Sequence, residues 1–71
     1  MVVVGIFQSE ANEERAIRLA GADTDEIYHE RIGPHETLLS IRAHDRAEAE
    51  HFCGILSRAG SQDVKIDAEA A

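Results

Sequence analysis

The sequence has a single cysteine, and one thiol cannot form an internal disulfide. The class of small secreted domains that disulfides hold together is therefore excluded. Basic residues are also few: seven lysines and arginines stand against fourteen acidic residues, which gives a formal net charge of −7 at pH 7. Proteins that bind duplex DNA or RNA normally present a basic surface, so we expect no nucleic-acid partner.

Long hydrophobic runs are absent as well. The apolar run at the start, Met1 to Val4, is interrupted by Gly5. No stretch approaches the ~20 apolar residues that a membrane-spanning helix needs, and no basic segment precedes a hydrophobic one as in a signal peptide. We therefore expect a cytoplasmic protein with no membrane partner and with its thiol reduced.

The chain has room for one small domain, residues 1–71. A domain of this size buries only about 60% of the surface that its unfolded chain exposes, so it is marginally stable alone. Its aromatic residues are Phe7, Tyr28 and Phe52 only. Among the devices that stabilise such domains, self-association is the one that this sequence favours, and we expect a homodimer.

The first half of the chain contains a predicted strand and a predicted helix. Residues 2–7 are β-branched or aromatic apart from Gly5, and their near-continuous apolar character places this strand in the centre of a sheet. Gly5 marks a bulge or the close approach of a neighbouring segment. Ser9 is a suitable N-cap for a helix over residues 9–20, because acidic residues follow it in the first turn.

Residues 24–32 fit two structures. Ile27 and His29 alternate with their neighbours as in a strand, whereas Thr24 can cap a short helix with acidic residues in its first turn. The pattern leaves both structures open. The Gly-Pro pair at 33–34 ends either one.

The second half repeats the pattern of the first. Residues 37–43 alternate between an apolar face and a mixed face, which predicts a strand. Asp45 and Glu48 have the spacing of a capping box, and apolar residues at helical intervals predict a helix over residues 46–59. A short final strand follows at residues 64–66.

With a strand at residues 24–32, the element order is βαββαβ, and residues 67–71 are left as a frayed tail. Right-handed crossovers then give an α+β, ferredoxin-like fold: a four-stranded antiparallel sheet with two helices on one face. The other face of the sheet stays uncovered. We expect this face to form the homodimer interface, with contributions from Val3, Phe7 and Leu38.

Six segments spread over most of the chain carry a resemblance to a known family. They are VVVGIF at 2–7, ERAI at 14–17, YHERI at 28–32, TLLSIRA at 37–43, DRAEAE at 45–50 and ILSRAG at 55–60. The chain resembles the bacterial general stress proteins of the heat-induced, YflT-like type, but it lacks the glycine-rich insert that many members carry between the two halves. The resemblance implies a helical end for residues 28–32, and it implies no catalytic residue, because the family has none established.

A second resemblance is confined to the start of the chain. The pattern Val-x-Val-Gly-x-Phe with a helix after it is similar to the opening of sporulation-related repeat (SPOR) domains. Those domains share the βαββαβ order and bind peptidoglycan strands outside the cytoplasm, behind a membrane anchor that this sequence does not show.

Four histidines and Cys53 raise the question of a metal site. The histidines are His29, His35, His44 and His51. Zn²⁺ takes tetrahedral N and S ligands, usually in closely spaced pairs, but no such pair is present, and His51 and Cys53 lie about 200° apart around an ideal helix. The remaining hypothesis is a weak metal site formed by His44 and His51, and surface histidines are the favoured interpretation.

Cys53 lies on the apolar stripe of the second predicted helix, which indicates a structural thiol. Reactive thiols need a positive environment, whereas the neighbouring Glu48 and Glu50 are negative. Phosphate-binding loops, a dinucleotide fingerprint and an EF-hand loop are absent from the sequence as well. We therefore expect no cofactor and assign no catalytic residue.

These observations favour a small non-enzymatic cytoplasmic protein, similar to the general stress proteins, that acts through protein–protein contact. Two alternatives stay open. One is a ligand- or metal-binding regulatory domain that uses His44, His51 or the sheet face. The other is a small dimeric enzyme of the ferredoxin-like kind, with a cleft between sheet and helices and with His29 or His44 as its base.

Self-association is expected to strengthen in mild acid. Histidine side chains ordinarily titrate near pH 6.5, and protonation of all four changes the formal net charge from −7 to −3, which weakens repulsion between copies. Light scattering should therefore rise between about pH 7.5 and about pH 5.5. A signal that does not change over this range contradicts the prediction.

Overall fold

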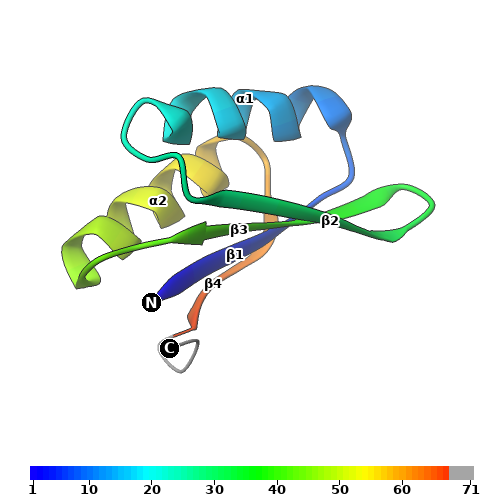
Figure 1. Cartoon of the computed structure of the whole chain (residues 1–71). Coiled ribbons are helices and arrows are strands. Elements are labelled where there is room, and N and C mark those ends of the chain that lie inside the picture. The colour runs from blue at the N-terminus through cyan, green and yellow to red at the C-terminus, as the bar shows by residue number, and fades with distance from the viewer. Residues whose placement is uncertain (68–71) are drawn as a thin grey trace.

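The computed structural model describes residues 1–67, in which two helices cover one face of a four-stranded sheet (Figure 1). The elements are, in chain order, β1 (Val2–Phe7), α1 (Glu10–Gly21), β2 (Ile27–Gly33), β3 (Glu36–Arg42), α2 (Arg46–Arg58) and β4 (Gln62–Asp67). In the sheet the order is β2-β3-β1-β4, and each neighbouring pair is antiparallel. The predicted ferredoxin-like fold is confirmed, with β1 in a central position.

Side-chain caps begin both helices where the sequence predicts them. The Ser9 hydroxyl accepts a hydrogen bond from the Asn12 N–H at 3.3 Å, and the Asp45 carboxylate accepts one from the Glu48 N–H at 2.8 Å. The Glu48 carboxylate reaches back to the N–H of His44 at 2.9 Å, one residue before the usual partner in a capping box. Within residues 1–67, neither helix combines the length and the hydrophobicity that crossing a bilayer requires.

Most of the segment with two possible structures is a strand. Ile27 pairs with Ile41 of β3, and the antiparallel pairing continues to the end of β2. The Thr24 hydroxyl accepts a hydrogen bond from the Glu26 N–H at 3.0 Å, which closes a turn before β2 instead of capping a helix. Pairing with β3, which lies later in the chain, therefore decides the structure of this segment.

The end of the chain differs in part from the prediction. Asp67 is the last residue of β4 and pairs with Val2, so the expectation that the frayed tail begins at this residue is wrong. The hydrogen bonds of the sheet hold it. The rest of the predicted tail, residues 68–71, lies outside the described residues.

The core fills the space between the inner face of the sheet and the two helices. Its largest fully buried side chains are Phe7, Phe52, Leu39, Ile41, Leu56 and Val3. Buried alanines on both helices accompany them, at Ala16, Ala20 and Ala49. Small residues at these positions let the helix backbones approach the sheet closely. A core with few aromatic residues is therefore still closely packed.

Two of the three residues predicted for the uncovered face are in this core. Val3 and Phe7 are 0% and 2% exposed, so the prediction that they contribute to a dimer surface is wrong. Alternate residues of a strand point to opposite faces, and Val3, paired with the buried Ile41, faces the helices. Leu38 is half-buried, adjacent to the fully buried Leu39, and therefore lies on the outer face.

Gly5 occupies a position where there is no room for a side chain. A Cβ atom there would collide with the Ser61 hydroxyl and would lie 3.2 Å from Cδ1 of Leu56. The pairing of β1 with β4 also shifts register between Val4 and Ile6. The close approach predicted as one of two alternatives for this glycine is thus confirmed, and the irregular pairing of β1 with β4 lies at the same position.

The substitution Gly5→Ala is expected to destabilise the protein by about 1–3 kcal/mol, because a methyl group forced into a packed interior displaces its neighbours. The matched control is Gly54→Ala on α2, where a Cβ meets no atom within 4 Å. Alanine should stabilise that helix by up to ~1 kcal/mol. Urea unfolding measures both changes, and equal midpoints for the two variants would contradict the close packing at Gly5.

Candidate functional site

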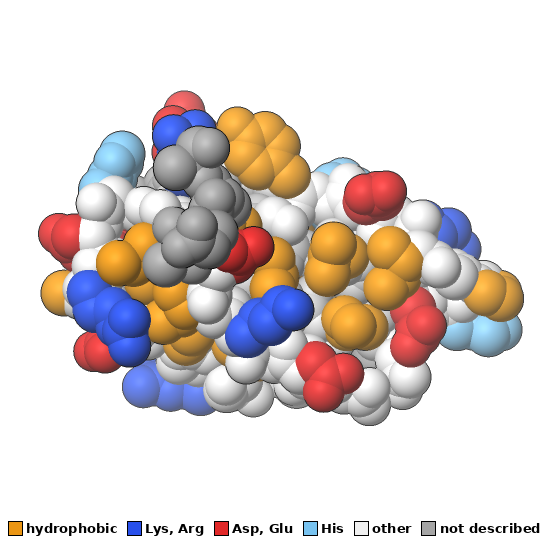
Figure 2. All heavy atoms as spheres, turned by 90° about the horizontal axis from the view of Figure 1, so that it is seen from below, with side chains coloured by type: hydrophobic (Ala, Val, Ile, Leu, Met, Phe, Trp, Pro, Cys, Tyr) orange, Lys and Arg blue, Asp and Glu red, His pale blue; other side chains and the backbone are white. Residues whose placement is uncertain are grey.

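The outer face of the sheet carries hydrophobic side chains that no helix covers (Figure 2). Strand alternation and pairing place four apolar residues on it, which we call the outer patch: Val4, Ile6, Tyr28 and Leu38. Tyr28 is 62% exposed, and the other three are half-buried. Contiguous apolar surface of this kind is typical of an interaction site.

Charged side chains border the outer patch on opposite edges of the sheet. Lys65 of β4 pairs with Val4, and Glu30 of β2 pairs with Leu38. Both charged residues are exposed. The patch therefore has an acidic residue along its β2 edge and a basic residue along its β4 edge.

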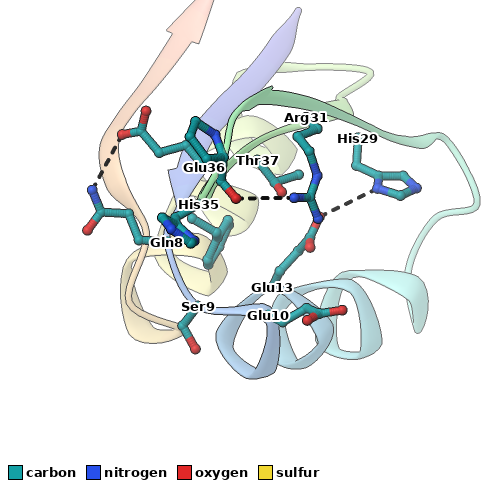
Figure 3. Close-up of a pocket in the computed structure, with 11 residues that line it drawn as sticks. Gln8, Ser9, Glu10, Glu13, His29, Arg31, His35, Glu36 and Thr37 are labelled. Atoms are coloured by element: carbon teal, nitrogen blue, oxygen red, sulfur yellow. Dashed lines mark hydrogen bonds and ion pairs between the residues drawn. The ribbon is translucent and has the colours of Figure 1, made fainter.

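A pocket of about 360 Å³ lies on the other side of the sheet, where the β2–β3 hairpin extends past the N-terminal end of α1 (Figures 1 and 3). Its walls come from the loop before α1, the first turns of α1 and both strands of the hairpin. Charged or titratable side chains dominate it, among them Glu13, His29, Arg31, His35 and Glu36. The helices leave most of the inner face of β2 exposed. Its polar residues therefore line the end of the sheet at which the pocket lies.

Glu13 is the one charged residue in the core of the described chain, at 8% exposed. Its Oε2 atom is buried without a hydrogen bond, and Nδ1 of His29 on β2 lies 3.6 Å from this atom. Figure 3 shows the two side chains reaching toward each other across the pocket wall. A buried carboxylate without a donor is costly, so protonation of His29 would compensate it and tie α1 to β2.

The other pocket groups bind one another. Arg31 donates to the carbonyl oxygen of Pro34 at 3.2 Å, and the Gln8 amide donates to the Glu36 carboxylate at 3.4 Å. Figure 3 shows the second ring nitrogen of His29 pointing away from the other labelled residues. The pocket thus holds a histidine beside a carboxylate, and none of the other residues labelled in Figure 3 lies in front of the second nitrogen of this histidine.

His44 and His51, the candidates for a weak metal site, lie about two helical turns apart along the chain. The Nε2 atom of His51 lies 2.8 Å from the Asp23 carboxylate, and this contact joins α2 to the loop after α1. His44 directly precedes the N-cap residue of α2. It lies seven residues before His51 in the chain, a separation that spans ~10 Å along a helix. Among residues 1–67, no three histidine, cysteine, aspartate or glutamate side chains are grouped closely enough to hold a metal ion.

Cys53 is half-buried against the core, as expected of a structural thiol. Burial raises the pKa of this thiol, and the negative charge of Glu50 raises it further, while the positive charge of Arg46 lowers it in part. Of the two acidic neighbours named from the sequence, Glu48 and Glu50, the effect on the thiol is confirmed for Glu50. The thiol therefore stays largely protonated at neutral pH, whereas nucleophilic chemistry needs the deprotonated thiolate.

Comparisons with protein-family models, with curated proteins and with solved structures found no match. The resemblances to general stress proteins and to SPOR domains therefore stay predictions.

Sequence reasoning missed the Glu13–His29 pair. Glu13 is one of the acidic residues after Ser9, which the sequence analysis explained only by their position near the helix N-terminus, where negative charge suits the helix dipole. A signal was present in the spacing, because Glu13, Ala16 and Ala20 lie three and four residues apart and share one face of α1. The position opposite, His29, followed only from the pairing of β2 with β3.

Alkylation of Cys53 by iodoacetamide at neutral pH is expected to be several-fold slower than alkylation of a free thiol such as glutathione, because its raised pKa leaves less thiolate. The rate should rise with pH and reach its midpoint above that of an ordinary thiol. Glu50→Gln should shift this midpoint down, and Glu14→Gln on α1 is the control. A pH profile identical to that of glutathione would disprove the shift.

Proposed function

We propose that this protein acts through protein–protein contact and forms a homodimer through the outer patch, without catalysing a reaction. The observation that carries the proposal is that the central strand β1 is apolar on both faces, with Leu38 of β3 beside it on the outer face, while both helices cover the other face. We further propose that it works in the cytoplasm, where Cys53 stays reduced, in a role related to that of the general stress proteins it resembles.

The gain from covering the outer patch is substantial for a chain of this size. Fully burying a leucine or isoleucine side chain contributes roughly 1.5–3 kcal/mol. Val4, Ile6 and Leu38 lie together on the central strands β1 and β3, so a second sheet can cover all three at once. A domain of 71 residues has a net stability of only a few kcal/mol, and dimerisation adds to it.

The pocket supports the alternative functions less well. An enzyme needs the histidine to face a substrate, and His29 presents its free nitrogen away from the other labelled residues of the pocket (Figure 3). A ligand that used the Glu13 carboxylate would have to displace His29, because the unpaired oxygen is buried. Glu13 and His29 therefore fit a structural tie between α1 and β2 better than a binding site.

The substitution Leu38→Glu is expected to convert the dimer into a monomer, because it places a charge in the centre of the buried interface. Multi-angle light scattering after gel filtration measures the mass at high micromolar concentration. The matched control is Leu19→Glu, which makes the same change at an exposed leucine on α1, away from the sheet. This control should remain dimeric.

Leu38→Thr keeps the β-propensity of the position and serves as a second variant if Leu38→Glu does not fold. It should weaken the dimer without loss of the circular-dichroism spectrum of the fold. A wild-type protein that is monomeric throughout, or a dimer that both Leu38 variants leave intact, would rule out the outer patch as the interface.

A further inference from the structure

The strand register arranges the outer face as a grid of side chains. One row across the sheet, read from β2 to β4, contains Tyr28, Ser40, Val4 and Lys65. The next row contains Glu30, Leu38, Ile6 and Gln62. In both rows the apolar residues of β1 lie in the middle, an acidic or aromatic residue lies on β2, and a basic or amide residue lies on β4. Over these two rows the face is therefore asymmetric from edge to edge, whereas the neighbouring row of Arg42, Val2 and Asp67 ends in an acidic residue on β4.

Two copies of such a face can meet about a two-fold axis in two main ways. If the axis runs along the strands, β2 lies over the partner's β4 and β3 lies over the partner's β1. If the axis runs across the strands, each strand lies over its own copy. Only the first arrangement brings the two unlike edges of the sheet together.

We infer that the axis runs along the strands, an inference that rests on the proposed homodimer. Lys65 then lies opposite the partner's Tyr28, with the partner's Glu30 one row away. The ammonium group contacts an aromatic ring and a carboxylate, both of which attract it. By symmetry the contact forms twice.

The same arrangement matches the apolar residues. Leu38 of one protomer lies over the partner's Ile6, and this contact is also formed twice. Sheets that pack face to face keep their strand directions within about 30° of each other, so the rows remain close to register near the axis. The two largest half-buried side chains of the outer patch, Leu38 and Ile6, thus cover each other at the centre of the interface.

Charge distinguishes the two arrangements. Each chain carries a net charge of −7, so association works against general repulsion. An axis across the strands places the β2 edge over the partner's β2 edge and the β4 edge over the partner's β4 edge, so Lys65 of one copy does not meet Glu30 of the other. An axis along the strands brings Lys65 of one copy close to Glu30 of the other, and this contact is attractive.

The test is a charge exchange between Lys65 and Glu30, with the dimer dissociation constant measured by sedimentation equilibrium. Lys65→Glu and Glu30→Lys should each weaken the dimer roughly tenfold, because symmetry loses the contact twice. The double variant restores unlike charges across the interface but not the contact of an ammonium group with Tyr28, so it should recover part of the lost affinity.

Glu30→Lys is the decisive variant, because net charge and specific contact predict opposite results for it. It reduces the net negative charge, so general repulsion alone predicts a tighter dimer. Glu14→Lys, at an exposed position on α1, makes the same change in net charge away from the sheet. It should leave the dimer unchanged or slightly tighter.

The outcomes separate this inference from the proposal beneath it. If the wild type is monomeric, both fail. If Leu38→Glu dissociates the dimer while Glu30→Lys binds as tightly as Glu14→Lys, or the double variant shows no recovery, the outer patch stands and the axis along the strands is overturned. Thermal melting of each variant verifies that it is folded.

Discussion

The structure depends on one mismatch: the central strand β1 has two apolar faces, but the two helices can cover only one of them. Packing of Phe7 and Leu39 against Phe52 and Leu56 fills the covered side. The right-handed crossovers of a βαββαβ chain put both helices on that side. The apolar residues of the other side are then left at the surface, and self-association is the remaining way to bury them.

The same layering explains the pocket. The β2–β3 hairpin extends beyond the N-terminal end of α1, so the last inner-face positions of the sheet are not covered (Figure 1). Polar residues occupy these positions, and the buried carboxylate of Glu13 lies at the border between the dry core and this wet end. Burial of this carboxylate at the end of the helix layer is unfavourable. A charge pair with His29 offsets the unfavourable burial when the histidine is protonated.

Local signals in the sequence predicted the elements well where the deciding interactions are local. Ser9 and Asp45 cap the helices through bonds to residues three positions later, and such bonds are visible in the spacing. The assignment of residues 24–32 stayed open because both candidate structures satisfy local preferences. Pairing of Ile27 with Ile41, fourteen residues later, resolved it.

The faces of the central strand show the limit of sequence reasoning. The run at residues 2–7 is apolar throughout, so alternation does not reveal which side chains face the helices, and Val3 and Phe7 were assigned to the wrong face. Composition, caps and strand periodicity determined the fold class, because each depends on neighbours in the chain. The buried face, the Glu13–His29 contact and the outer patch were decided by tertiary packing, because they depend on which distant segments share one interior.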